Sequence, residues 1–195
     1  EDVTLNAVGG DVTVGVIGAA DGQINDVTIT GATINLGGNI NTEDGAGPDA
    51  GDVDINGNVI LTAAVTIDTS DAAAGVVDGT FNISGTVDGA FDLDIITDSA
   101  IAGIVGVIGG TTALATLDIN KTAGATGAVT ISNNIGTTTA AGVTGATLIG
   151  NANTSTLTLA GAVYNANAAT YTAVVGDNIS LTAGADVTFT SSNDA

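Results

Sequence analysis

Clustered acidic residues are the part of this sequence with the clearest potential for chemistry. Ca²⁺ takes six to eight oxygen ligands from carboxylates, carbonyls and water, and a flexible Gly-rich loop with several acids could supply them. The spacing here matches neither an EF-hand loop nor the Gly-Gly-x-Gly-x-Asp repeat of calcium-binding β-rolls. The alternative is a loop whose acids are only solvated. The candidate calcium ligands are Glu43, Asp44, Asp49, Asp52 and Asp54, and a second, weaker group is Asp68, Asp71 and Asp78.

Catalysis has few residues to work with. The chain contains no His and no Cys, which excludes Ser-His-Asp and Cys-His nucleophiles, and its single Lys and lack of Arg offer no phosphoryl clamp. A carboxylate pair for glycoside hydrolysis remains, with Asp92, Asp94 and Asp98 as the most clustered acids. Asp92 and Asp94 alternate with Phe91, Leu93 and Ile95, which predicts a solvated acidic face of one strand. We therefore expect no enzyme and no catalytic residues.

The charge of the chain is extreme and uneven. One Lys, Lys121, faces 21 acids, which gives a net charge of −20. Such a chain should repel nucleic acid and anionic membrane surfaces, and should attract divalent cations or stay soluble in concentrated salt. Eighteen of the acids lie between Glu1 and Asp118. The nearly neutral remainder is better suited to packing against a neighbour.

A short phrase with alternating apolar and polar residues recurs along the whole chain. In Asp2-Val-Thr-Leu-Asn6 and its variants, an extended backbone sends two apolar side chains to one face and the Thr between them to the other. Gly is abundant and interrupts every Ala-rich run, so we expect no helix. The sequence therefore predicts a single all-β domain over 1–195, acid-rich over 1–118 and near-neutral over 119–195, with no firm boundary.

Two all-β architectures fit the spacing of these phrases. Gly9-Gly10, Thr30-Gly31-Ala32 and Asn56-Gly57 read as turns between short strands. Strands every 8–12 residues would indicate a β-sandwich or jelly roll. Pairs of spacings, however, sum to 24, 26 and 28 residues, which suits one turn of a solenoid with loops of variable length. We favour the parallel β-helix, a β-solenoid, and keep the sandwich as the alternative.

Location and membrane association are also constrained by the sequence. The most apolar run, 100–108, is shorter than the roughly 20 residues that span a bilayer, so we expect no integral membrane segment. The absence of Cys is compatible with secretion without disulfides. The start at Glu1 without Met fits a mature product after signal removal or a segment of something longer.

The repeated phrases resemble those of large bacterial surface proteins. The Val-Thr-Ile phrases, the Asn-Gly and Gly-Gly pairs and the segment 171–190 look like the repeats of haemagglutinin-type adhesins and autotransporter passengers, whose shafts are parallel β-helices. The Asn-Pro signatures of the two-partner secretion domain are missing, since Pro48 is the only proline. The resemblance implies a shaft or subunit displayed at the cell surface, with a role in adhesion or scaffolding.

These observations favour a structural role outside the cell or at its surface. Open strand edges are normally blunted by charge, Pro or a covering helix, and the C-terminal third has few charges, no Pro and no recognisable cap. We expect a self-associating filament or shaft subunit, a homo-polymer whose contacts involve the strand at Asp2–Asn6 or the segment Ile179–Thr190. The alternative is an adhesin module that recognises a glycan or cell surface through its loops.

Overall fold

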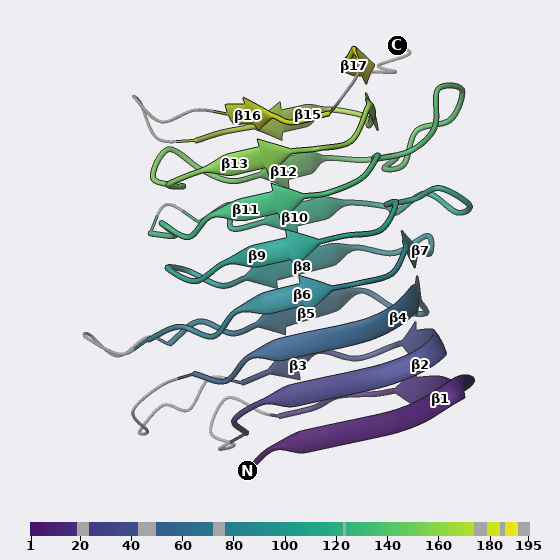
Figure 1. Cartoon of the computed structure of the whole chain (residues 1–195), viewed down its shortest axis with the longest axis vertical. Helices are drawn as coiled ribbons and strands as arrows, with labels where there is room; N and C mark the ends of the chain where they lie inside the picture. Colours follow the sequence, from purple (N-terminus) through teal and green to yellow (C-terminus); the bar gives the residue numbers. More distant parts are fainter. Residues whose placement is uncertain are drawn as a thin grey trace.

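The computed structural model describes residues 1–18, 24–42, 50–71, 77–122, 124–173, 179–183 and 186–190. Within them the chain winds into a β-solenoid of about seven turns and contains no helix (Figure 1). The strands β1 and β16 lie at opposite ends of the column. All strand pairs are parallel, and each joins one turn of the chain to the next. The predicted solenoid is confirmed, and the sandwich alternative is wrong.

Each turn of the solenoid, called a rung below, contributes to three faces. The first sheet has the order β1-β2-β4-β6-β9-β11-β13-β16, and the second has the order β15-β12-β10-β8-β5-β3. The third face is built from the second halves of β1, β2 and β4, then β7, isolated bridges, β14 and β17. The strands are β1 (Val3–Val14), β2 (Val27–Leu36), β3 (Ile40–Asn41), β4 (Val53–Leu61), β5 (Val65–Asp68), β6 (Phe81–Ile83), β7 (Val87–Asp88), β8 (Leu93–Ile96), β9 (Ala102–Ile104), β10 (Leu117–Ile119), β11 (Val129–Ile131), β12 (Thr147–Ile149), β13 (Leu157–Leu159), β14 (Val163–Asn165), β15 (Ala169–Tyr171), β16 (Ile179–Leu181) and β17 (Thr188–Thr190).

The register of the first rungs follows the spacing of the repeated phrases. Val3 pairs with Val27, Val27 with Val53, and Val53 with Phe81, which are steps of 24, 26 and 28 residues. Period-2 alternation then places the same kind of side chain at the same position in every rung. The copies of the phrase that contain Val3, Val27, Val53 and Phe81 are therefore first-sheet strands, and the loops absorb the differences in length.

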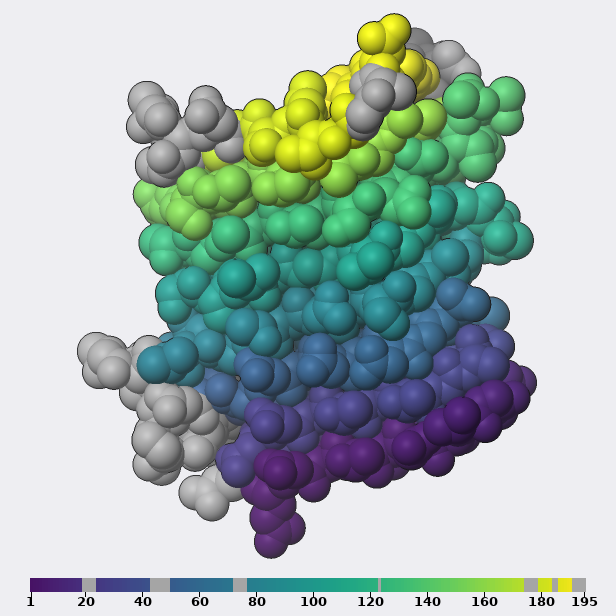
Figure 2. All heavy atoms as spheres, viewed as in Figure 1, coloured from purple at the N-terminus to yellow at the C-terminus, as the bar shows by residue number. Residues whose placement is uncertain are grey.

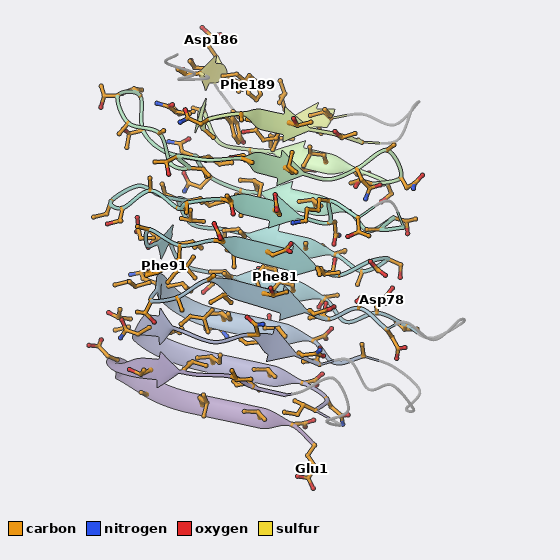
Figure 3. The ribbon with its side chains drawn as sticks, turned by 180° about the vertical axis from the view of Figure 1, so that it is seen from behind. Glu1, Asp78, Phe81, Phe91, Asp186 and Phe189 are labelled. Atoms are coloured by element: carbon orange, nitrogen blue, oxygen red, sulfur yellow. The ribbon has the colours of Figure 1, made fainter. Side chains whose placement is uncertain are left out.

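Columns of apolar side chains fill the interior. One column on the second sheet runs Ile17, Ile40, Ile67, Ile95, Ile119, Ile149 and Tyr171. In the middle rungs these Ile side chains are fully buried. Phe81 of the first sheet, near the centre of the molecule in Figure 3, is fully buried as well. Stacking identical β-branched side chains buries apolar surface at about 25 cal/mol per Å² without needing aromatic residues. This explains how a chain with 3% aromatics builds a continuous core.

The expected turns at three Gly positions are wrong. Gly9-Gly10, Gly31 and Gly57 lie inside the long strands β1, β2 and β4, where they mark a bend from the first sheet to the third face. The chain bends there without reversing, because each strand pairs with the next rung and not with its own continuation. The same pairs would have been hairpin turns in the sandwich alternative.

At this bend, glycines of successive rungs approach one another closely. A Cβ on Gly57 would lie 2.0 Å from the carbonyl oxygen of Gly31, and one on Gly85 would lie 2.2 Å from that of Gly57. A Cβ on Gly106 would in turn lie 2.1 Å from the carbonyl oxygen of Gly85. Such separations are far below van der Waals contact. The four glycines form a column along one corner of the solenoid, called the glycine column below.

Candidate functional site

The first candidate calcium group is described only in part. Glu43, Asp44 and Asp49 lie outside the described residues. Asp52 is exposed, and its Oδ1 accepts hydrogen bonds from the Thr80 backbone N–H (2.7 Å) and hydroxyl (2.9 Å) in the next rung. Asp54 faces outward on β4 between Thr28 and Asn82 of the neighbouring strands. Asp52 therefore joins two rungs, Asp54 is an exposed residue of the outward face, and the calcium site stays a prediction.

Many other acids and amides serve the same stacking role. A side-chain oxygen of one rung accepts from backbone N–H groups of the next in each case, which satisfies donors at the corners where the sheets end. Asp26 accepts from Asp52, Asn39 from Thr66, and Asn58 from Thr86. Asp88 accepts from both Thr111 and Thr112. Asp26 and Asp88 therefore have a structural role as acceptors between rungs.

The second acidic group is gathered at one corner. The Asp71 N–H donates to Asp78 Oδ1 at 2.8 Å, and the hydroxyl and N–H of Ser99 both donate to Asp78 Oδ2. Burial, followed by the negative charges of Asp78 and Asp68, raises the pKa of the nearby Asp98 carboxyl. Figure 3 shows Asp78 at the edge of the column. Within the described residues no group of three or more acids has an arrangement suited to a metal ion.

A shallow groove on the second sheet holds the only cation of the chain. The groove has a volume of about 380 Å³, and its polar lining includes Asp92, Asp94, Asp118 and Lys121. Asp94 and Asp118 are direct neighbours on β8 and β10. The Lys121 ammonium lies 3.3 Å from Asp94 Oδ2 and also contacts Asp118 Oδ2. Lys121 therefore bridges two stacked carboxylates, and we call the three residues the lysine bridge.

The electrostatics of the lysine bridge follow from partial burial. Burial raises the pKa of Asp94, and the charge of Lys121 works in the opposite direction. The hydrogen bond to Asp118 raises the pKa of the Lys121 ammonium, although burial opposes this. The other oxygens, Asp94 Oδ1 and Asp118 Oδ1, are buried and have no hydrogen-bond partner. The arrangement can hold two rungs together, and sequence reasoning did not find it because Lys121 follows β10 and reaches back across the sheet.

The three acids proposed for glycoside hydrolysis do not form one site. Asp92 and Asp94 both line the groove, but Asp98 lies with the Asp78 group. Asp92 is exposed and accepts from the Thr116 hydroxyl at 2.7 Å. Phe91, expected on the core face, is 40% exposed, because the regular strand β8 begins only at Leu93. The expectation of no enzyme stays a prediction.

The two terminal rungs differ from the middle of the column in their burial. Leu5 in β1 is half-buried, whereas Ile29 and Ile55, its counterparts in the next two rungs, are fully buried. At the other end Leu181 is 50% exposed, although its partner Leu159 is fully buried. Core columns thus end with their apolar side chains open to solvent at both ends.

The backbone edges of the terminal rungs are also open among the described residues. In five later rungs, the residue at the position of Asn6 donates its backbone N–H to a carbonyl of the preceding rung. The pairs are Ser84 to Ile55, Val105 to Ile83, Ser132 to Ile104, Ala160 to Ile131 and Thr182 to Leu159. Asn6 lies in the first rung, so its N–H points away from the column. In six earlier rungs, the residue at the position of Ile179 donates its backbone N–H to a carbonyl of the following rung. Val129, for example, donates to Thr156, and Ala102 donates to Ala128. The N–H of Ile179 points out of the opposite end.

An aromatic cluster lies beneath the C-terminal end. Tyr164 and Phe189 are stacked with ring centroids 5.2 Å apart, and Tyr171 contacts both rings edge-on. Phe189 is 50% exposed, and burial raises the pKa of both tyrosines. Figure 3 places Phe189 at the end of the column opposite Glu1. Phe189 comes from the rung after Tyr164, which is why spacing alone did not predict the contact.

Comparison with known proteins adds no functional assignment. No protein-family model, no curated protein and no solved structure matches the chain. The described residues include no helix long and apolar enough to cross a membrane. The candidate functional regions are therefore the lysine bridge and the two terminal rungs.

Proposed function

We propose that this protein is a structural, self-associating β-solenoid, a filament or surface-shaft subunit that acts outside the cell. The observation that carries the proposal is the exposure of core columns at both ends. Leu181 is 50% exposed and Phe189 is 50% exposed, at positions that are fully buried one rung earlier. Contact with another molecule would remove this apolar surface from water and satisfy the open backbone edges.

The faces along the column support end contacts over lateral ones. Acids and amides at the corners are engaged with the next rung, and the outward positions of the strands are mainly Thr, Asn and Asp. A net charge of −20 opposes side-by-side packing of columns. Figure 2 shows one side of the molecule as a stack of layers. Growth along the column axis is thus the favoured mode of association.

A proline substitution at the N-terminal edge tests the proposal. Asn6→Pro removes an N–H that points away from the column, so we expect loss of polymers with a change in monomer stability of no more than about 1 kcal/mol. Asn6→Ala keeps the N–H and removes only the side chain, and it should polymerise like the parent protein. Sedimentation velocity over a range of concentrations, with circular dichroism for strand content, gives the readout. Equal polymerisation of both variants would reject end contacts.

The adhesin alternative keeps one supporting observation. Phe189 and Tyr171 offer partly exposed ring surface at the C-terminal end, and sugars stack on such rings. A monomeric preparation retained on a glycan array would favour this alternative, and Phe189→Ala should then abolish retention.

A further inference from the structure

We propose that copies of this chain stack head to tail, with β1 of one copy pairing in parallel and in register with β16 and β17 of the copy before it. The inference rests on the proposed self-association and adds its polarity and register. Every strand pair among the described residues is parallel, and the register shifts only at the bends in the β1–β2 and β2–β4 pairs, so a head-to-tail junction would repeat the geometry already used between rungs.

The apolar columns of the two ends match each other in this arrangement. The first column runs from Val3 to Ile179 and the second from Leu5 to Leu181, each through consecutive parallel partners. The column on the third face runs from Val12 to Phe189. Stacking the next copy places Val3 on Ile179, Leu5 on Leu181 and Val12 on Phe189. All six side chains are partly or largely exposed in the single chain.

The backbone donors and acceptors are complementary in the same register. By the pattern of the internal rungs, the Asn6 N–H would donate to the Leu181 carbonyl of the preceding copy. The Ile179 N–H would in turn donate to the Asp2 carbonyl of the following copy, as Val3 donates to Asp26 within the chain. No strand has to change its conformation. The junction would therefore be one more rung-to-rung contact.

Charge distinguishes this polarity from the head-to-head arrangement. The first rung carries Glu1, Asp2 and Asp11, whereas Asp186 is the only charged residue among 179–183 and 186–190. Two N-terminal ends in contact would bring six carboxylates together, and like charges across an interface are strongly unfavourable. An acidic end against a nearly neutral end avoids this cost. A heterologous contact of this kind does not close on itself and produces an open fibre.

Cysteine cross-linking tests the polarity and register directly, because the chain has no Cys. Thr4 and Ser180 occupy the same outward column, so Thr4→Cys and Ser180→Cys would bring Cα atoms about 4.8 Å apart across a head-to-tail junction. Each single variant is purified reduced, and the two are then oxidised together and separately. We expect a disulfide-linked dimer in the mixture only. Peptide mapping of the dimer identifies the linked pair.

Matched controls separate the outcomes. In a mixture of Asn6→Cys and Ser180→Cys, the two cysteines would be displaced by two residues along the strands. Their Cα atoms would be about 8 Å apart, so they should not cross-link. Thr130→Cys with Thr158→Cys joins adjacent rungs of one chain and should cross-link within it. Thr13→Cys mixed with Thr190→Cys reports on the third face, independently of β16.

Four results would overturn the inference. Cross-linking of Thr4→Cys with itself would indicate head-to-head contact, and cross-linking of Ser180→Cys with itself would indicate tail-to-tail contact. Polymers that form normally and yield no cross-link in either mixture would retain the proposed function but reject this register. Absence of polymers together with absence of cross-links would reject the proposed function as well.

Discussion

At the scale of single residues, Lys121 has a disproportionate effect on the charge balance of the column. It is the only cation in the chain, and it separates two carboxylates that are neighbours on adjacent strands. Asp94 and Asp118 have side chains 27% and 16% exposed, so water screens their repulsion incompletely. The lysine bridge thus converts a repulsive pair into a contact that joins rungs.

Replacing Lys121 should destabilise the protein in a pH-dependent way. We expect Lys121→Met to lower the free energy of unfolding by about 1–3 kcal/mol at pH 7, since two partly buried carboxylates lose their cation. The folded-state pKa of Asp94 is already raised by burial, and loss of Lys121 raises it further. A raised carboxyl pKa means that the folded state binds the proton more tightly, so stability falls as pH rises above 3.8.

Urea denaturation at pH 4.5 and pH 7 measures this effect. The loss caused by Lys121→Met should be smaller at pH 4.5, where a carboxyl of the pair is more readily protonated. Asp94→Asn combined with Lys121→Met should recover part of the stability at pH 7, because one of the two charges is gone. An equal loss at both pH values, with no recovery in the double variant, would show that Lys121 acts through packing alone.

At the scale of elements, the glycine column sets how closely the rungs approach at one corner. We expect Gly85→Ala to cost about 2–3 kcal/mol, because the new Cβ would meet the Gly57 carbonyl oxygen, a backbone atom that cannot swing away. Gly103→Ala is the matched control. The nearest neighbour of the new Cβ would be Asn82 Oδ1 at 3.5 Å, which is an ordinary contact. The free energy of unfolding of this variant should therefore change by no more than about 0.5 kcal/mol. Thermal unfolding of both variants gives the comparison, and similar melting temperatures would refute the close approach.

The strands could be predicted from sequence far better than the corners between them. The repeated phrase of alternating apolar and polar residues reappears in β11 and β13, because burial on one face of a strand imposes that pattern directly. The prediction of hairpin turns at the Asn-Gly and Gly-Gly pairs is wrong, because these residues occur both where the chain reverses its direction and where a single strand bends. Which one occurs depends on whether the neighbouring strand comes from the same rung or the next, and that is a long-range property.

Candidate sites were harder to predict than strands for a related reason. The acids stand out in the sequence by their number, but Asp26, Asp52 and Asp88 accept hydrogen bonds from backbone N–H groups 23–28 residues away in the next rung. Those partners depend on loop lengths that differ from rung to rung. The lysine bridge and the aromatic cluster likewise join residues from different rungs, so neither leaves a local signature in the sequence.

At the scale of the whole molecule, the distribution of charge suits end-to-end growth. The acid-rich N-terminal part keeps columns apart laterally, while the nearly neutral C-terminal rung can accept another copy. A fibre built this way would keep its strands perpendicular to its axis. The repeat along the axis would then be set by the number of rungs in one chain.

Electron microscopy of the purified chain, with the axial repeat measured from averaged fibres, tests the central claim most directly. With rungs about 4.8 Å apart and a first sheet that runs from β1 to β16, head-to-tail stacking should give a subunit repeat of about 38 Å together with a 4.8 Å spacing along the same axis. Isolated particles at every concentration, or fibres whose strands run along the axis, would contradict the claim.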